Sequence, residues 1–164
     1  MKRMLRRLAL LLIVALPGTA AAEGPRVEIF EHGRYAAGEF VHTPDPSQLG
    51  GQRWSAPVRN VERTDTIPGH LGRIFGFRVR IHDAALQGQT LTFRIRHPKL
   101  TAPSGRTATE HLHTAVAPAP GGTLGHFFAF EYTYEIAEGD WTFEVMHEGR
   151  VLAAQKFRVV VSMF

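Results

Sequence analysis

Two stretches decide the fold, Phe75-Gly76-Phe77-Arg78-Val79-Arg80-Ile81 (residues 75–81) and Leu91-Thr92-Phe93-Arg94-Ile95-Arg96 (residues 91–96). In both, large apolar side chains alternate with polar or small ones. Successive side chains of a β-strand point to opposite faces, so alternation with a period of two predicts a strand that is buried on one face only. Each stretch therefore predicts a strand whose arginines point away from the core.

The same alternation recurs in the rest of the chain, whereas helical periodicity is hard to find beyond residue 22. It is clearest from Phe128 to Ile136, where every second residue is aromatic or aliphatic. It predicts further strands over residues 141–145 and 157–161. Weaker strands are expected at 27–35, 58–64 and 107–116.

Turn residues separate these runs. Gln87-Gly88 lies between the two arginine-bearing strands, and residues 147–150 predict a hairpin turn between the last two strands. Because no helix is available for a parallel crossover, we expect an all-β, antiparallel, two-sheet immunoglobulin-like sandwich of about seven to eight strands. A small closed barrel is the weaker alternative, since the stretches 36–57 and 98–106 resemble long connections rather than simple hairpins.

The N-terminus has the plan of a secretory signal peptide. Residues 1–7 carry four positive charges, a nine-residue apolar run spans 8–16, and small residues precede Glu23. That run is far shorter than the roughly 20 residues of a membrane-spanning helix. We expect residues 1–22 to be removed by cleavage after Ala22, which leaves residues 23–164 as one domain, periplasmic or secreted, with no transmembrane segment.

Cleavage would also remove the basic character of the chain. Lys plus Arg falls from 19 to 15 while Asp plus Glu stays at 15, so the formal charge of residues 23–164 is zero. A nucleic-acid-binding domain is normally basic, which argues against a nucleic-acid partner. The absence of cysteine excludes thiol nucleophiles, thioredoxin-like redox chemistry and cysteine-based zinc sites.

Five short patterns occur in a characteristic order. They are Gly33-Arg34-Tyr35, Ile67-Pro68 with Leu71-Gly72, Phe75-Gly76-Phe77-Arg78-Val79, Gly139-Asp140-Trp141-Thr142-Phe143-Glu144 and Gln155-Lys156-Phe157-Arg158-Val159. Together they resemble the bacterial domain-of-unknown-function family 3859, over roughly residues 26–161. The resemblance implies an exported immunoglobulin-like domain to which no activity, cofactor or catalytic residue is assigned, so it supplies no site.

Motifs for common hydrolytic chemistry are missing. None of Ser47, Ser55, Ser104 and Ser162 lies in a Gly-x-Ser-x-Gly elbow. The carboxylate pairs Glu131 with Glu135 and Glu144 with Glu148 are expected on the solvated outer surface, because residues four apart on a strand share a face. The Gly69–Arg73 segment precedes no helix pattern, so we interpret it as a turn rather than a phosphate loop.

The four arginines are the most organised polar feature. If the strands that carry Arg78 and Arg80 and Arg94 and Arg96 pair through the Gln87-Gly88 turn, their side chains form one cationic patch. Such a patch would bind a glycan, a lipid headgroup or an acidic protein partner. The favoured alternative is ion pairing across strands with Glu131, Glu135 and Glu144, each pair being worth only a few tenths of a kcal/mol.

His111-Leu112-His113 is the most tempting metal motif, because residues two apart on a strand share a face and imidazole suits zinc and copper. We expect residues 107–116 and 124–136 to pair as a hairpin with Leu112 and Phe128 on the inner face. In that register His126 points inward while His111 and His113 point outward beside Glu131. The three imidazoles then do not converge, and we predict that no transition metal is bound.

Two tryptophans have different expected roles. Trp141 alternates with Phe143 and Val145, which predicts a core anchor. Trp54 lies in an irregular segment, where it either contacts a carbohydrate or peptide or, as the favoured interpretation, covers one edge of the sandwich.

These features favour a non-catalytic exported domain, a binding or accessory module that acts through a sheet face or its loops. The sequence indicates no cofactor, and the partner is an unidentified protein, glycan or anionic ligand. Two alternatives remain open: a periplasmic enzyme or metal-handling protein with polar residues at one end of the sandwich, and a structural subunit that acts by strand addition.

Overall fold

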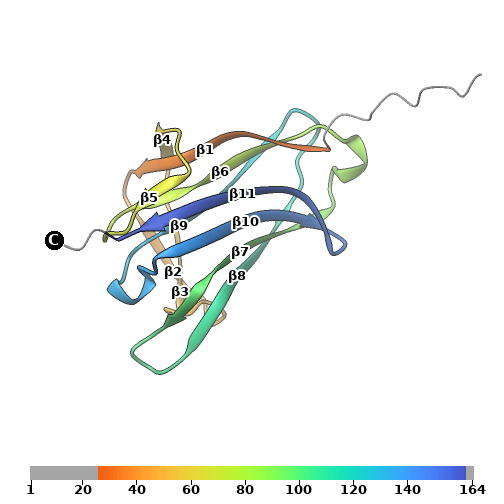
Figure 1. The fold of residues 1–164 in the computed structure, drawn as a ribbon. Coiled ribbons are helices and arrows are strands. Elements are labelled where there is room, and N and C mark those ends of the chain that lie inside the picture. Colours follow the sequence, from red (N-terminus) through yellow and green to blue (C-terminus); the bar gives the residue numbers. More distant parts are fainter. Residues whose placement is uncertain (1–25, 162–164) are drawn as a thin grey trace, which may run out of the picture.

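The structure is a computed structural model that describes residues 26–161, so the predicted leader at 1–22 lies outside the described residues. Eleven strands and two single-turn 3-10 helices follow one another along the chain (Figure 1). The elements are β1 (Val27–Ala37), β2 (Val41–Pro44), β3 (Gln52–Ser55), β4 (Val58–Glu62), β5 (Thr66–Pro68), β6 (Ile74–Ile81), η1 (Ala84–Leu86), β7 (Thr90–Thr101), β8 (Thr107–Val116), β9 (Thr123–Ala129), η2 (Thr133–Glu135), β10 (Gly139–His147) and β11 (Arg150–Val160). No helix in this part of the chain is long and apolar enough to span a membrane.

Nine of the strands form two sheets that pack face to face (Figure 1). One sheet has the order β4-β1-β6-β9 and the other β5-β11-β10-β7-β8. All neighbours are antiparallel except β5 and β11. The predicted immunoglobulin-like sandwich is confirmed, with more strands than expected because the irregular N-terminal third contributes several short ones.

The core is aromatic. Phe75 and Phe77 of β6 are fully buried and face Trp141 and Phe143 of β10 in the opposite sheet. The ring centroids of Phe75 and Trp141 lie 5.5 Å apart with the rings near perpendicular, a favourable edge-to-face arrangement. The indole N–H of Trp141 donates a hydrogen bond of 3.0 Å to the carbonyl oxygen of Ala137. The predicted core role of Trp141 is confirmed.

The predicted hairpin between β8 and β9 is wrong. β8 pairs with β7, and β9 pairs with β6, so these two consecutive strands belong to different sheets. The segment 117–122 that joins them crosses from one sheet to the other, and backbone hydrogen bonds hold both its ends. Ala117 exchanges two of them with Gly88 and Gln89, each 2.9 Å, and the other end of the segment exchanges two with Ile81, of 2.7 and 3.0 Å.

The strand predicted over 128–136 is also shorter than expected. β9 ends at Ala129, and η2 follows at Thr133–Glu135. The Glu135 carboxylate accepts hydrogen bonds from the backbone N–H groups of Glu131 and Tyr132, at 2.8 and 3.0 Å. These bonds fold the segment into a tight loop, so Glu131 and Glu135 do not share a strand face as predicted.

β6 and β9 approach each other closely at Gly76, which pairs with Phe127. A Cβ atom at Gly76 would collide with the carbonyl oxygen of His126. Glycine at this position therefore lets β9 lie against the centre of the sheet, and it places the His126 side chain inside the sandwich.

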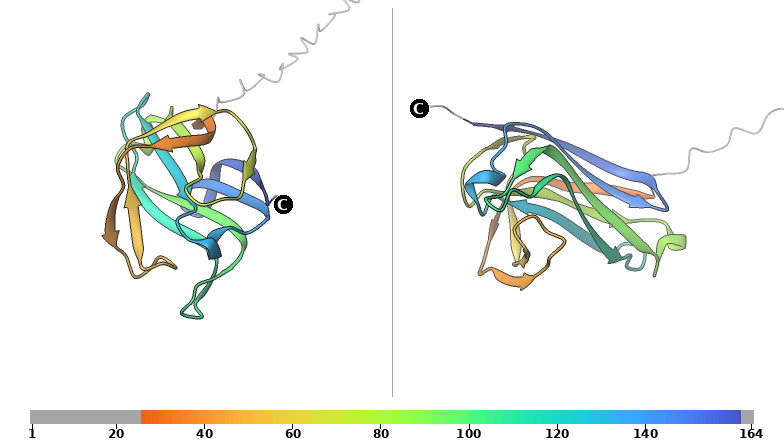
Figure 2. Two further views of the ribbon diagram at one scale, coloured as in Figure 1. Left: turned by 90° about the vertical axis from the view of Figure 1, so that its left-hand side faces the viewer. Right: turned by 90° about the horizontal axis from the view of Figure 1, so that it is seen from below.

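β2 and β3 form a separate hairpin within the stretch 36–57, which was predicted as a connection. Figure 2 shows the pair standing beside the sandwich, on the side where the two sheets end at β8 and β9. Trp54 of β3 packs on Phe40, with ring centroids 5.1 Å apart, and joins a small second cluster around Tyr35 and Ile74. Trp54 therefore packs over an edge of the sandwich, which agrees with the favoured interpretation, and it also lines the cavity described below.

Candidate functional site

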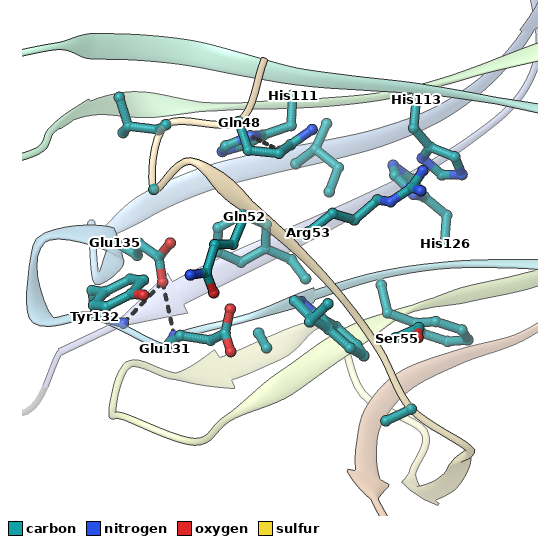
Figure 3. A pocket seen from close by; sticks show the side chains of 18 of the residues that line it. Gln48, Gln52, Arg53, Ser55, His111, His113, His126, Glu131, Tyr132 and Glu135 are labelled. Atoms are coloured by element: carbon teal, nitrogen blue, oxygen red, sulfur yellow. Dashed lines mark hydrogen bonds between the residues drawn. The ribbon is translucent and has the colours of Figure 1, made fainter. Parts of the chain in front are cut away.

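A cavity of about 380 Å³ opens where the two sheets part, between β8 and β9. The segment from Gln48 to Ala56, which includes β3, forms its outer wall, and the loop from Glu131 to Glu135 closes one end (Figure 3). Side chains from both sheets form the remaining walls. The cavity thus gathers residues from four segments that are distant in sequence.

β8 supplies two imidazoles to this cavity. His111, His113 and Ala115 are partly buried, whereas Leu112 is 49% exposed. The predicted facing of β8 is therefore inverted: His111 and His113 point toward the sandwich interior. Their rings pack on aromatic neighbours, His113 on Phe93 at 4.9 Å and His111 on Phe128 at 5.2 Å between ring centroids.

β9 supplies a third imidazole, His126, which points inward as predicted and is 5% exposed. Its ring centroid lies 4.6 Å from that of His113. On the other side of the cluster, the His111 ring lies 4.9 Å from that of His97 on β7. The sandwich edge therefore holds a row of four imidazoles, which the expected hairpin would have separated.

Burial keeps these imidazoles uncharged. Desolvation lowers the pKa of His111 to about 4, with a further contribution from the neighbouring His97. Desolvation also lowers the pKa of His126 well below its usual range, and His113 and His111 add to the effect. The pKa of His113 is lowered by desolvation and by the positive charge of Arg53. At neutral pH the row is a set of neutral aromatic rings with nitrogen donors and acceptors.

The hydrogen bonds of His111 define which of its nitrogens is free. Nδ1 lies 3.1 Å from the side-chain oxygen of Gln48, which can only accept, so Nδ1 carries the proton and donates. Nε2 is then an acceptor, and it is buried without a hydrogen-bond partner among the described residues. Nε2 of His126 is buried and unpartnered in the same way. A buried polar atom without a partner costs about 1–3 kcal/mol, so both nitrogens favour a bound group that hydrogen-bonds to them, and Nε2 of His111 favours a donor.

The outer wall is built by a tight turn. Asp45 accepts from the backbone N–H and the hydroxyl of Ser47, at 3.0 and 2.6 Å, and its own N–H donates to the carbonyl of Gly51. Arg106, in the β7–β8 turn, donates to the carbonyl of Pro46 at 3.2 Å. These contacts fasten the turn beside the end of β8. From this wall, the side chain of Arg53 extends toward His113 and His126 (Figure 3).

Acidic and aromatic groups occupy the opposite end of the cavity. Burial raises the pKa of Glu135 to about 7, although its hydrogen bonds from the Tyr132 and Glu131 backbone act in the other direction. The Glu131 carboxylate lies 2.5 Å from Nε2 of His42 on β2. Tyr132 stacks on Tyr134 with ring centroids 5.3 Å apart and an interplanar angle of 9°. This end therefore offers a carboxyl that is easily protonated, a paired carboxylate and an aromatic face.

The predicted arginine patch does not form. Arg78 and Arg80 lie on β6 and Arg94 and Arg96 on β7, and these strands belong to different sheets because η1 and its flanking turns carry the chain across the sandwich. The two pairs therefore cannot join across the Gln87-Gly88 turn.

Each arginine pair has acidic partners of its own. Arg94 and Arg96 both bind the Glu144 carboxylate, at 2.6 and 2.9 Å. Glu144 is only 4% exposed, because the two guanidinium groups cover it. Arg78 lies 3.5 Å from Glu31, and Arg80 lies 3.7 Å from Glu28. Ion pairing was the favoured interpretation, and Glu144 is the only predicted acid that takes part in it.

Within residues 26–161, no three His, Asp or Glu side chains come together in an arrangement that could hold a metal ion. The absence of bound metal stays a prediction, and the reason first given for it, outward-facing His111 and His113, is wrong.

The outer wall of the cavity was not predicted from the sequence. Gln48, Gln52 and Arg53 belong to a segment without periodicity, and no motif marks them as site residues. The one available signal was Trp54, a large aromatic residue in an irregular stretch.

Comparison with known proteins agrees with the immunoglobulin-like fold. A crystal structure of an immunoglobulin-like protein from Pseudomonas aeruginosa is similar, with a TM-score of 0.59 and 24% sequence identity over 86% of this chain and 99% of that one. A 102-residue stretch, 60% of this chain, is 32% identical to part of the RNA-directed RNA polymerase VP2 of Aquareovirus A. The chain spans only 8% of that polymerase, so the polymerase activity is not carried over.

Residues 23–159 match the family described as a domain of unknown function, DUF3859. This match covers most of the chain and agrees with the resemblance found in the ordered sequence patterns. The protein therefore belongs to the DUF3859 family and folds as an immunoglobulin-like β-sandwich.

Proposed function

We propose that this protein is an exported, non-catalytic binding domain that takes a small organic ligand into the cavity between β8 and β9. One observation carries the proposal: the cavity is walled by both sheets and by the Gln48–Ala56 segment, and it combines aromatic surface with several convergent polar side chains. Ligand sites in proteins are typically clefts of about 300–1,000 Å³ with this combination. A volume of about 380 Å³ suits a ligand at the small end of that range.

Export is supported by the charged, apolar and small-residue regions of residues 1–22. The zero formal charge of residues 23–164 also suits a domain that meets a small ligand rather than nucleic acid.

The proposal is tested by closing the cavity. Gln52 lines the outer wall and points into the space (Figure 3), so Gln52→Trp is expected to fill it. Gln89→Trp, at an exposed position in the β6–β7 connection, is the matched control. Thermal melting is measured with a panel of saccharides, amino acids, dipeptides, nucleosides and carboxylic acids, since a ligand that binds only the folded state raises Tm.

We expect at least one class to raise the Tm of the wild-type protein and of Gln89→Trp but not that of Gln52→Trp. If no class stabilises the wild-type protein, or if the stabilisation persists in Gln52→Trp, the cavity is not a ligand site.

A second candidate, acid–base catalysis, is favoured by one observation. The pKa of Glu135 is raised to about 7 by burial, and Glu131 lines the same cavity. A carboxyl that titrates near neutral pH is suited to general acid or base chemistry. Turnover of a bound ligand by the wild-type protein and not by Glu135→Gln would support this candidate over simple binding.

A further inference from the structure

We propose that the ligand of this cavity is an uncharged saccharide of one or two rings, whose hydroxyl groups hydrogen-bond to Nε2 of His111 and Nε2 of His126. The inference rests on the proposed function, because it specifies the ligand of the same site. Three features of the cavity support it: buried ring nitrogens without partners, opposite charges at the two ends, and aromatic surface.

Two ring nitrogens of cavity-lining histidines are buried without a hydrogen-bond partner among the described residues. Nε2 of His111 must accept because Nδ1 donates to Gln48, and it has no partner among the described residues. Nε2 of His126 is also buried and unpartnered, on a side chain that is 5% exposed. Both residues line the cavity. A hydroxyl group donates to a bare ring nitrogen and accepts from a protonated one, so it can satisfy Nε2 of His111 and either tautomer of His126.

Donors lie on the facing wall. Gln52 presents an amide and Arg53 a guanidinium, and both come from the Gln48–Ala56 segment (Figure 3). A group that meets both walls must therefore donate on one side and accept on the other. Hydroxyl groups do both, whereas ammonium and guanidinium groups only donate and carboxylates only accept.

The cavity carries opposite charges at its two ends, so an ion that spans it meets a like charge at one end. Arg53 is the positive group near the imidazoles, and it would repel a cation there. Glu131 is paired with His42, and it would repel an anion at the other end. The imidazoles are neutral near pH 7 and supply no countercharge. Transfer of an ion into such a site costs more than transfer of a neutral molecule that makes the same hydrogen bonds.

The aromatic residues complete the match. Tyr132 stacks on Tyr134, is 42% exposed and lines the cavity, and Trp54 lines it from β3. The negative face of an aromatic ring attracts the weakly positive C–H groups on the face of a sugar ring. The cavity thus offers aromatic surface for the C–H face of a sugar ring, together with hydrogen-bond donors and acceptors for its hydroxyl groups.

The experiment compares sugars of one shape and different charge. Glucose, N-acetylglucosamine and maltose are the neutral probes, and glucosamine and glucuronate are their positive and negative relatives at about pH 6. Binding is measured by saturation-transfer NMR and by calorimetry on the purified, processed protein. The variants are His126→Phe and His111→Phe, which keep a ring of similar size but remove the ring nitrogens, with His147→Phe of β10 as the matched control.

We expect at least one neutral sugar to bind the wild-type protein and His147→Phe equally. Loss of one hydrogen bond should weaken binding about five- to tenfold in each cavity variant. Circular dichroism checks that the variants fold, and if His126→Phe does not, His111→Phe and Gln52→Trp still locate the site.

Three results would overturn the inference. Tighter binding of glucosamine or glucuronate than of the neutral sugars would reject the saccharide class while leaving the cavity as a ligand site. Neutral-sugar binding that is unchanged in His111→Phe and His126→Phe would place the sugar elsewhere. If none of the probes binds but the wider panel contains a class that Gln52→Trp excludes, the proposed function stands without this inference; if no class binds at all, both fail.

Discussion

Glu135 shows how one buried side chain can organise a loop and make it sensitive to pH. A single carboxylate oxygen accepts from two backbone N–H groups, and these bonds hold the loop that closes one end of the cavity. The same burial raises the pKa of Glu135 from 4.5 to about 7. The folded protein therefore keeps a proton that the unfolded chain has lost between these pH values.

This proton predicts the pH dependence of Glu135→Gln. The stability associated with protonated Glu135 is fully present below pH 4.5 and is lost as the pH rises through about 7. A shift of this size corresponds to roughly 3 kcal/mol at most. Glutamine keeps an oxygen for the two N–H donors and has no charge to desolvate, so we expect the variant to unfold like the wild type at pH 4 and to be more stable by ~1–3 kcal/mol at pH 8.

Urea unfolding at the two pH values measures the effect, and Glu138→Gln, at an exposed position, is the control. A gain at pH 8 that is equal in both variants would show that surface charge, not the burial of Glu135, is responsible.

Trp141 carries a prediction about the core. It is fully buried and contacts Phe75, Phe128 and Phe130. We expect Trp141→Ala to destabilise the protein by ~3–5 kcal/mol, through lost burial and the cavity that remains. Chemical denaturation measures this change, and Trp54→Ala, at a partly buried position in the smaller cluster, should cost clearly less. Near-wild-type stability of Trp141→Ala would show that the indole is not a core anchor.

At the scale of elements, alternation predicted the strands of the core and failed at the edge. β6, β7, β10 and β11 were predictable because each has a paired strand on both sides and buries one face against the opposite sheet. Hydrophobicity alone therefore specifies which of their side chains face inward. β8 has a neighbour on one side only. There the neutral rings of His111 and His113 pack inward on aromatic residues while Leu112 stays half exposed, and a histidine that packs as an aromatic ring cannot be distinguished from a polar one in the sequence.

The loop after β9 misled the prediction for a different reason. Phe130 is fully buried, and its N–H donates to the carbonyl of Arg73, so it packs in the core from outside β9. Aromatic residues at every second position satisfy a strand and a tight loop over a core equally well. The deciding contact, the Glu135 carboxylate on two N–H groups, involves a residue type that ordinary strands also carry. The candidate site could not be predicted for the same two reasons, since the edge strand β8 and this loop form part of its walls.

The edge strands carry a prediction about metals. His113 and His126 lie side by side, but no third His, Asp or Glu of residues 26–161 completes a metal-binding group with them. Catalytic zinc normally takes three protein ligands and structural zinc four. We therefore expect elemental analysis of tag-free protein to find no stoichiometric zinc or copper. Metal that is present near one equivalent and disappears in the His111→Ala/His113→Ala double variant would contradict this and favour a metal-handling role.

At the scale of the whole molecule, the first prediction concerns export. Residues 1–22 have the three-part plan of a cleaved signal, and we expect a mature protein that starts at Glu23. N-terminal sequencing of protein recovered from the periplasm or the medium tests this. Protein that retains Met1 and stays with the membrane would instead indicate an uncleaved anchor.

The segment 117–122 links the two sheets of the sandwich at one end. Backbone hydrogen bonds clamp its two ends to the neighbouring strands, and Pro118 and Pro120 stiffen it, so the two sheets are held at a set separation there. The cavity lies farther along β8 and β9, which pair with β7 and β6 and not with each other. The segment that joins the two sheets and the side chains that line the cavity therefore belong to separate parts of the chain. A change in the length of segment 117–122 is expected to alter the spacing of the two sheets, and with it the entrance of the cavity, without changing the side chains that line it.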